Sequence, residues 1–352
     1  MLINKKKLIV VAGKSNLSIY ILNKLLKYFK VNDLGVVISS SDNGKNSWQL
    51  SLKRFSSRNK IKIYRLDEIY KLAEIFISCE YEKIIDINKF KTKKLFNYHF
   101  SLLPKYRGVY TSIWPLLNED KYSGVTIHQM TNKIDAGKII LQKKYLIKND
   151  DCSLDIYLKN ILCGQLITDK FMKFLLENKL KYKKQIPTKL KYKSKKSYNF
   201  KKNEISIFSD SNTIQKTIRA LSFRPYQLAK FKNQNIVNCE ILKKASLEKP
   251  GTILFKNKFF LEISTLDKNI RIYFDKHHEF IKCIKKDDIL GVKKLKKNIV
   301  NINDRDKLLR TPLIIAAIYE SKKCLEYFIN TGANKKLKDV YEKTYKEYLD
   351  NE

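Results

Sequence analysis

The sequence is poor in the residues that carry covalent, redox or metal chemistry. Its 352 residues include only six Cys, four His and two Trp, and neither a Cys-x-x-Cys nor a Gly-x-Ser-x-Gly pattern occurs. The six Cys have the spacing of neither a disulfide framework nor a zinc site, so we expect them to be reduced and buried. The absence of these motifs argues against a cysteine or serine nucleophile. We also predict no metal site.

Long apolar runs are also missing. No run approaches the roughly 20 residues that a membrane span requires, and residues 1–7 lead directly into a short apolar segment instead of a signal peptide. The hydrophobic fraction of 43% and the aromatic fraction of 12% argue against disorder. We therefore expect a folded, cytoplasmic protein without a membrane partner.

Acidic residues are few relative to basic ones. The chain has 72 Lys and Arg against 35 Asp and Glu, which gives a formal net charge of +37. Only nine of the basic residues are Arg, the side chain on which sequence-specific nucleic-acid readers and bidentate phosphate clamps usually depend. The Lys residues are spread along the chain, which indicates a compositional bias more than a designed patch. We expect no nucleic-acid partner, although charge alone leaves one open.

The first half of the chain alternates predicted strands and helices. We expect strands at residues 8–12, 34–39, 61–65, 83–87 and 138–147, and helices at 19–28, 66–79 and 153–178. This alternation predicts an α/β fold with a doubly wound parallel sheet that binds ligands at its strand ends. Gly13-Lys14-Ser15 resembles the end of a phosphate loop, but Leu8 stands where that motif needs Gly, so we predict no ATP site.

A polar trio follows the predicted strand at 83–87. Asn97 offers an amide N–H that could stabilise an oxyanion, and His99 can exchange a proton near neutral pH. Asp135 could orient and charge-stabilise that imidazole. Such a set suits acyl transfer to an amine without a covalent intermediate. From spacing alone, a capping Asn, a core His and a turn Asp are the simpler explanation of the three residues.

Three short patterns in this region follow one another in a fixed order. They are Asn97-x-His99-x-Ser101-Leu102-Leu103-Pro104-x-Tyr106-Arg107-Gly108, Gly124-Val125-Thr126-Ile127-His128 and Ile134-Asp135-x-Gly137. Together they resemble the catalytic core of the folate-dependent formyltransferases, which act on glycinamide ribonucleotide, methionyl-tRNA or nucleotide-linked amino sugars. The resemblance implies catalytic roles for Asn97, His99 and Asp135, and 10-formyltetrahydrofolate as co-substrate. We expect His128 to be structural, on a strand behind the site.

The resemblance also implies a cofactor site on the first pattern, at Leu102, Pro104, Arg107 and Gly108. Two departures concern the acceptor. Many members of the family have Pro where Phe100 stands, and the tRNA enzymes follow Arg-Gly with small residues and a Pro where this chain has residues 109–114. The sequence pattern therefore leaves the acceptor amine open.

Residues 179–202 are rich in Lys and Tyr, and they read either as a solvated linker or as a basic, aromatic wall for a diphosphate and a base. Residues 214–231 resemble a helix and loop that formyltransferases place near the active site, with Pro225-Tyr226 where many members have Pro-Gly. From these two segments and residues 109–114 we predict four acceptor-binding residues, which are Trp114, Tyr198, Asn199 and Tyr226. Residues 236–275 predict a small β region with a hairpin across 256–258.

The last part of the chain changes character. Residues 310–317, Arg-Thr-Pro-Leu-Ile-Ile-Ala-Ala, and Gly332-Ala333-Asn334 resemble an ankyrin repeat, with Ile314 in place of the usual His. We therefore predict three parts: a formyltransferase catalytic domain at 1–178, a linker and small α+β region at 179–275, and an α-helical ankyrin-repeat domain at 276–352. The ankyrin part reads equally as a stabilising cap or as a binding surface.

Within this resemblance, ankyrin units on a formyltransferase core suggest an enzyme that formylates a dTDP-linked 3-amino-3,6-dideoxyhexose for a surface polysaccharide such as O-antigen. The family implies a homodimer. Two alternatives differ in class. A methionyl-tRNA formyltransferase would explain the charge but should end in a nucleic-acid-binding barrel. A non-catalytic ankyrin protein should have lost part of the trio, and all three residues are present.

Overall fold

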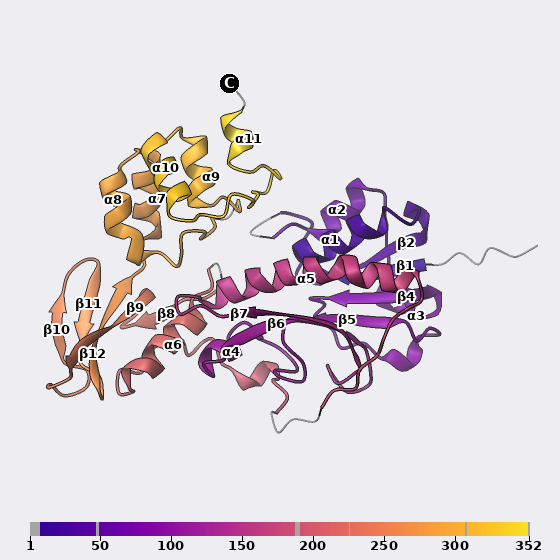
Figure 1. Ribbon diagram of the computed structural model, residues 1–352, viewed down its shortest axis with the longest axis horizontal. Helices are drawn as coiled ribbons and strands as arrows, with labels where there is room; N and C mark the ends of the chain where they lie inside the picture. Colours follow the sequence, from indigo (N-terminus) through magenta and orange to yellow (C-terminus); the bar gives the residue numbers. More distant parts are fainter. Residues whose placement is uncertain (1–7, 47–48, 187–190, 225, 307, 351–352) are drawn as a thin grey trace, which may run out of the picture. The chain divides into compact units, whose positions relative to one another are not determined.

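The computed structural model describes residues 8–46, 49–186, 191–224, 226–306 and 308–350 (Figure 1). The chain forms two compact units, and each unit is assembled from three separate segments of the chain. The first unit comprises Met1–Thr111, Lys121–Ile147 and Ile156–Ser197, and the second comprises Ser112–Asp120, Lys148–Asp155 and Tyr198–Glu352. The division into three domains at 178 and 275 stays a prediction.

The first unit is built on a seven-stranded sheet with the order β3-β2-β1-β4-β5-β6-β7. Its strands are β1 Leu8–Gly13, β2 Leu34–Ile38, β3 Lys62–Ile63, β4 Ala73–Cys79, β5 Leu95–His99, β6 Tyr122–Gln129 and β7 Ile139–Leu146. The first five strands pair in parallel, β6 is antiparallel to β5, and β7 is antiparallel to β6. The predicted doubly wound α/β core is confirmed, with a mixed sheet in place of an entirely parallel one.

Helices cover both faces of this sheet because β1 and its neighbours are apolar on both sides. Ile9 and Val11 face a core with α1 Ser15–Leu25, α2 Leu52–Arg58 and α5 Ser153–Leu176. Val10 and Ala12 face the opposite core, where α3 Leu66–Leu72 contributes Ile69. Successive residues of β1 thus alternate between the two cores, which is the two-residue period of a strand. Helix α5 runs along the sheet in Figure 1.

Two predicted elements near the site were wrong. The helix predicted at 66–79 ends at Leu72, and Ala73–Cys79 forms β4, because the β-branched and aromatic run around Phe76 is buried between β1 and β5. The strand predicted at 83–87 does not form, since Ile84 is 80% exposed and Asp86 caps a 3-10 helix at Ile87–Lys89. The strand that carries the site is β5 instead.

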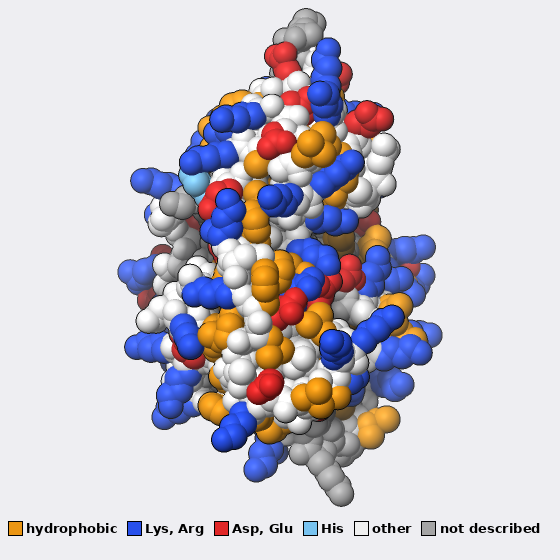
Figure 2. All heavy atoms as spheres, turned by 90° about the vertical axis from the view of Figure 1, so that its left-hand side faces the viewer, with side chains coloured by type: hydrophobic (Ala, Val, Ile, Leu, Met, Phe, Trp, Pro, Cys, Tyr) orange, Lys and Arg blue, Asp and Glu red, His pale blue; other side chains and the backbone are white. Residues whose placement is uncertain are grey.

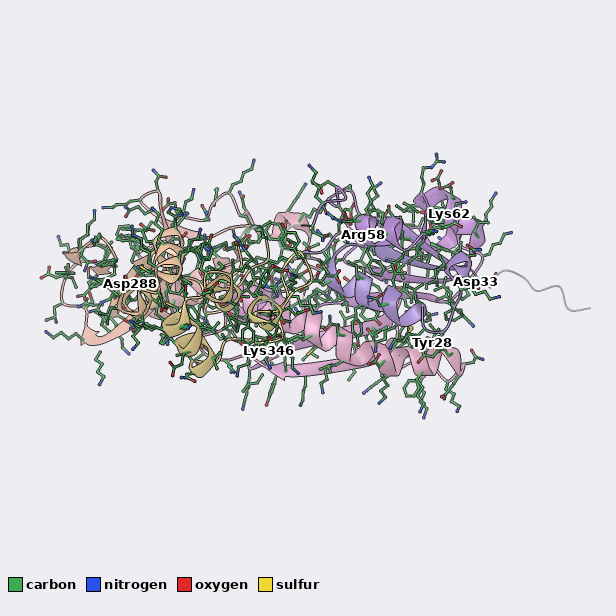
Figure 3. All side chains as sticks on the ribbon, turned by 90° about the horizontal axis from the view of Figure 1, so that it is seen from above. Tyr28, Asp33, Arg58, Lys62, Asp288 and Lys346 are labelled. Atoms are coloured by element: carbon green, nitrogen blue, oxygen red, sulfur yellow. The ribbon has the colours of Figure 1, made fainter. Side chains whose placement is uncertain are left out.

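The sheet ends at a short, charged edge. Only Lys62 and Ile63 of the predicted strand 61–65 pair with β2, and both are exposed. Lys62, labelled in Figure 3, places its ammonium 4.7 Å from the centre of the Tyr64 ring. A short edge strand with a Lys discourages pairing with another chain.

The Lys- and Tyr-rich segment after α5 is exposed over most of its described length, and its backbone is bound to the first sheet and the site loop at two points. Lys183 exchanges two backbone hydrogen bonds of 2.8 Å with Ile139 at the start of β7. Lys193 donates to the Arg107 carbonyl and accepts from Val109, also at 2.8 Å. We call residues 183–186 and 191–193 the strap. It is held to the rest of the first unit by its backbone, while the side chains of Lys183, Lys184 and Lys191 are exposed.

The second unit contains an antiparallel five-stranded sheet in the order β10-β11-β12-β9-β8. Its elements are α4 Trp114–Leu117, α6 Ser211–Leu221, β8 Ala229–Phe231, β9 Gln234–Ala245, β10 Ile253–Lys256, β11 Phe260–Ile263 and β12 Lys268–Phe274. One face of α6, with Ile214, Ile218 and Leu221, shares a core with this sheet. The predicted β region and its hairpin are confirmed.

Short helices follow the sheet, at α7 His277–Lys285, α8 Ile289–Leu295, α9 Pro312–Ile318, α10 Lys322–Asn330 and α11 Lys346–Leu349. Phe280 of α7 and Phe328 of α10 meet in their shared core, with ring centroids 6.1 Å apart. Asp288, labelled in Figure 3, caps α8, and Thr311 caps α9 immediately before its first-turn proline. The assignment of these helices to an ankyrin repeat stays a prediction. Further 3-10 helices lie at Val31–Asp33, Lys195–Ser197 and Lys296–Asn298.

The surface carries the excess positive charge in a dispersed form. On the face drawn in Figure 2, Lys and Arg side chains are scattered among hydrophobic and acidic ones and do not gather into one patch. This distribution agrees with a compositional bias in favour of Lys. Among the described residues, no helix combines the length and hydropathy of a transmembrane span.

Candidate active site

The site begins where two strands of opposite direction lie side by side. Asn97 and His99 are the third and last residues of β5, and β6 pairs with β5 so that His128 stands opposite Asn97. Asn97 Nδ2 lies 3.2 Å from His128 Nε2. The sheet register therefore brings together two polar side chains that are 31 residues apart in the chain.

Asp135 reaches this pair from the loop between β6 and β7. Gly137 allows the loop to close, because a Cβ at that position would lie 1.7 Å from the Gln129 carbonyl oxygen. Asp135 itself has a φ of +50°, in the left-handed region that non-glycine residues seldom adopt. The loop thus holds Asp135 in an unfavourable backbone conformation that directs its carboxylate into the site.

The Asp135 carboxylate is the centre of the cluster. Its Oδ2 accepts a hydrogen bond from the Gly108 N–H at 2.8 Å and lies 3.4 Å from His99 Nδ1. Its Oδ1 lies 3.3 Å from both Asn97 Nδ2 and His128 Nε2. Burial alone would raise the pKa of Asp135, but the two imidazoles and the Gly108 N–H outweigh it and lower that pKa. The carboxylate is therefore ionised at neutral pH.

His99 is buried, and each of its ring nitrogens faces a protein oxygen. Nε2 lies 2.8 Å from the Tyr106 carbonyl oxygen, which can only accept, so Nε2 carries a proton. Nδ1 faces Asp135. Burial lowers the pKa of His99, and the charge of Asp135 partly opposes that effect. The resting imidazole is thus neutral, beside a carboxylate that would stabilise its protonated form.

Gly108 connects the cluster to the strap. Its φ is +105°, and a Cβ there would lie 2.1 Å from the Lys193 carbonyl oxygen of the strap. Only glycine fits this close approach, which leaves its N–H free to bind Asp135. The loop before it is held by Thr126, whose Oγ1 donates to the Ser101 carbonyl at 2.6 Å and accepts from the Leu103 N–H at 3.1 Å.

The residues predicted to bind the cofactor lie on this loop. Gly108 contacts Asp135 through its backbone. Leu102, Pro104 and Arg107 are half-buried, with Pro104 following a cis peptide bond and the Arg107 carbonyl bound by the strap. Their contacts with a folate stay a prediction.

The four residues predicted to bind the acceptor lie in the second unit, where the structure brings two of them together. Trp114, 7% exposed, meets the ring of Tyr198 edge-to-face at 6.0 Å. Asn199 is exposed and its side chain accepts a hydrogen bond from the Lys201 N–H. Tyr226 is 60% exposed and contacts Phe223, while the preceding Pro225 lies outside the described residues. Their roles in binding an acceptor stay a prediction.

His128 was missed as a member of the site. We placed it behind the site, but its Nε2 faces Asp135, and its Nδ1 is directed at the Gln129 carbonyl at 2.9 Å. The available signal was its place at the end of Gly124-Val125-Thr126-Ile127-His128, seven residues before Asp135. The antiparallel register that sets it beside Asn97 could not be read from that pattern.

The cluster is built as a hydrogen-bonding network. Its contacts, of 2.8–3.4 Å, join ring nitrogens and amide groups to one carboxylate and to the backbone carbonyl of Tyr106. Within the described part of the chain, no group of three or more His, Cys, Asp or Glu side chains has the arrangement of a metal site. Such a network suits proton movement and charge stabilisation.

Comparison with known proteins supports this interpretation. A family model described as "Formyl transferase" matches residues 34–160, a range that contains the whole cluster. Among curated proteins, the bifunctional polymyxin resistance protein ArnA of Wigglesworthia glossinidia brevipalpis is 31% identical over 281 residues. That match covers 74% of this chain and only 42% of ArnA. Methionyl-tRNA formyltransferases of several bacteria match at 26–28% identity.

Two solved structures are similar over almost their whole length. WlaRD, a sugar 3N-formyl transferase solved with dTDP and 5-N-formyl-THF, is 36% identical with a TM-score of 0.69, over 76% of this chain and 98% of WlaRD. The N-formyltransferase of Helicobacter canadensis, solved with folinic acid and dTDP-3-aminofucose, is 33% identical with a TM-score of 0.70, over 76% of this chain and 99% of that one. The protein studied here therefore belongs to the formyl transferase family and is a formyltransferase enzyme.

Proposed function

We propose that this enzyme transfers the formyl group of 10-formyltetrahydrofolate to the amine of a dTDP-linked 3-amino-3,6-dideoxyhexose. The observation that carries the proposal is the near-complete match to two sugar formyltransferases at 36% and 33% identity. One of these proteins was solved with dTDP and the other with dTDP-3-aminofucose. Folate use is supported by the formylated folates bound in the same two structures.

The proposed reaction is direct transfer. The neutral sugar amine attacks the formyl carbon, a new C–N bond forms to the sugar nitrogen, and the bond from carbon to N10 of the folate breaks. The proton that leaves the amine ends on N10. Asn97 and the charged form of His99 stabilise the oxyanion of the tetrahedral intermediate. Asp135 stabilises His99 while it holds the proton.

The geometry supports a division of labour around Asp135. The resting imidazole of His99 is neutral, so it can take up a proton as the amine loses one, and the nearby carboxylate then pairs with the imidazolium. The Gly108 N–H holds the carboxylate from another direction. His128 accepts from the Asn97 amide through Nε2, because its Nδ1 donates to the Gln129 carbonyl. His128 is thus proposed as a support for Asn97 that does not itself meet the substrate.

Methionyl-tRNA is a second candidate acceptor, because enzymes of that class are among the relatives and the net charge is +37. Two observations favour the sugar. Identity to the tRNA enzymes is lower, at 26–28%, and on the one face that Figure 2 draws the basic side chains are dispersed and form no continuous track for a polyanion.

The remaining features of the proposal concern the rest of the molecule. The helices α7–α10 form two consecutive pairs with a shared core, and Thr311-Pro312 begins α9 as the ankyrin pattern predicts. We infer that they are a short ankyrin-like array. A homodimer and a role in O-antigen synthesis are also part of the proposal, and both rest on the family resemblance.

The test is formyl transfer from 10-formyltetrahydrofolate to a panel of acceptors. The panel contains dTDP-linked 3-amino and 4-amino sugars of both C4 configurations, and charged methionyl-tRNA. Turnover of a 3-amino sugar, with kcat/KM at least 100-fold above that for the tRNA, is the expected result. Exclusive turnover of the tRNA would refute the sugar assignment, and a 4-amino preference would refute the position.

A further inference from the structure

The strap places one side-chain amide directly on the loop that carries Asp135. Gln185 Nε2 donates to the Asp135 carbonyl and to the Gly137 carbonyl, both at 2.8 Å. Because both partners are carbonyl oxygens, they can be bound only by the NH₂ end of the amide, which fixes its orientation. The amide NH₂ group has two hydrogens, and each of them is donated to one of the two carbonyl oxygens.

These two hydrogen bonds bind a turn whose backbone has an unfavourable conformation. Asp135 has a φ of +50°, and Gly137 is closely packed against the Gln129 carbonyl. A non-glycine residue in the left-handed region is strained and persists there only when its surroundings fix it. Gln185 binds the carbonyls on both sides of Ala136, so one side chain restrains this turn at two points.

The backbone of the strap is anchored close to Gln185. Lys183, two residues earlier, is bound to Ile139 by the backbone bonds described above. At the other end of the side chain, Gln185 Oε1 is buried and has no hydrogen-bond partner among the described residues. Gln185 therefore binds the Asp135 loop only through its NH₂ group, and its carbonyl oxygen makes no contact that holds the loop.

We propose that Gln185 is a positioning residue for catalysis: by binding the carbonyls of residues 135 and 137, it holds the Asp135 carboxylate within reach of His99. The inference rests on the proposed function in assigning Asp135 a part in formyl transfer. It assigns a role to a segment outside the three motifs that carry the family resemblance.

The variant Gln185→Met tests the donor, because Met keeps the length of the side chain and has no N–H. We expect kcat to fall 10- to 100-fold with the KM of each substrate within threefold, since a misplacement of about 1 Å can cost that much in rate. Gln185→Glu should lose more, because a carboxylate would face two carbonyl oxygens. Lys183→Ala is the matched control on the same strap, and it should retain wild-type kcat.

A second readout does not require turnover. The pKa of His99, followed by NMR and assigned with His99→Asn, should fall in Gln185→Met, because a displaced carboxylate no longer raises it. Melting curves establish that each variant is folded; should Gln185→Met not fold, Gln185→Asn, which keeps the amide on a shorter arm, replaces it in both experiments. Unchanged kcat overturns the proposal, and so does a lower kcat with an unchanged His99 pKa. If the wild type turns over no acceptor, the proposed function fails, and the NMR result still decides the role of Gln185.

Discussion

Replacing Asp135 by Asn removes one negative charge from the centre of the cluster and keeps the size of the side chain. The carboxylate is 9% exposed, so its charge is little screened by solvent. An Asn can place its one oxygen at the Gly108 N–H, which is the shortest contact, at 2.8 Å. Its NH₂ then lies where Oδ1 stood, 3.3 Å from the Asn97 amide nitrogen.

The magnitude follows from the contacts that are lost. Two donors would face each other at Asn97, and His99 would lose the charge that stabilises its protonated form. Charge-assisted hydrogen bonds contribute roughly 1.5–3 kcal/mol each, so two losses amount to about 3–6 kcal/mol. Because about 1.4 kcal/mol corresponds to a factor of ten in rate, we expect kcat to fall by about 10²–10⁴.

The assay is formyl transfer at saturating folate and acceptor, with kcat and KM measured separately. Asp67→Asn is the matched control, since it makes the same chemical change at an exposed ion pair with Arg65. The expected result is a large loss of kcat with little change in KM for Asp135→Asn alone. An Asp135→Asn enzyme that is folded and retains more than a tenth of wild-type kcat would refute the reasoning.

Three further predictions concern pH and stability. Burial lowers the pKa of His99, so the enzyme should lose stability as the pH falls below about 6.5, where the unfolded chain takes up a proton that the folded one resists, and it should lose activity only at lower pH, where His99 of the folded enzyme becomes protonated; a pH–rate profile with no acidic limb, or melting curves flat from pH 7 to 5, would contradict this. Gly137→Ala would put a Cβ 1.7 Å from the Gln129 carbonyl oxygen, and urea unfolding should show a loss of about 2 kcal/mol or more, through strain of the kind that makes a few substitutions severe; a change under 0.5 kcal/mol would mean that the loop adapts. Arg224 lies 2.7 Å from Asp275 and 3.0 Å from the buried Asp304, so Arg224→Met should cost about 3–5 kcal/mol, as expected when one partner of a buried ion pair is removed, and an unchanged urea midpoint would show that the pairs contribute no net stability.

Parts of the fold were predictable because the periodicity of the apolar residues matches the face that each element buries in the folded protein. The apolar run of β1 and the long amphipathic α5 were recognised from residue periodicity. The boundary at Leu72 was not, because the apolar spacing of α3 continues into the buried run of β4 without a Gly or Pro between them. Pairing with β1 and β5 on both sides decides that Ala73–Cys79 is a strand, and such long-range pairing leaves no local signal.

The sequence by itself identified three of the residues that form the polar cluster. Asn97, His99 and Asp135 were identified from a motif, and glycine at 108 and 137 is required by two close backbone approaches. Only the tertiary structure decided how these residues meet. The β5–β6 register set His128 beside Asn97, and the strap returned about fifty residues later to bind the Asp135 loop through Gln185. Strand register and backbone contacts between distant segments depend on the whole fold, and for that reason they leave little trace in residue order.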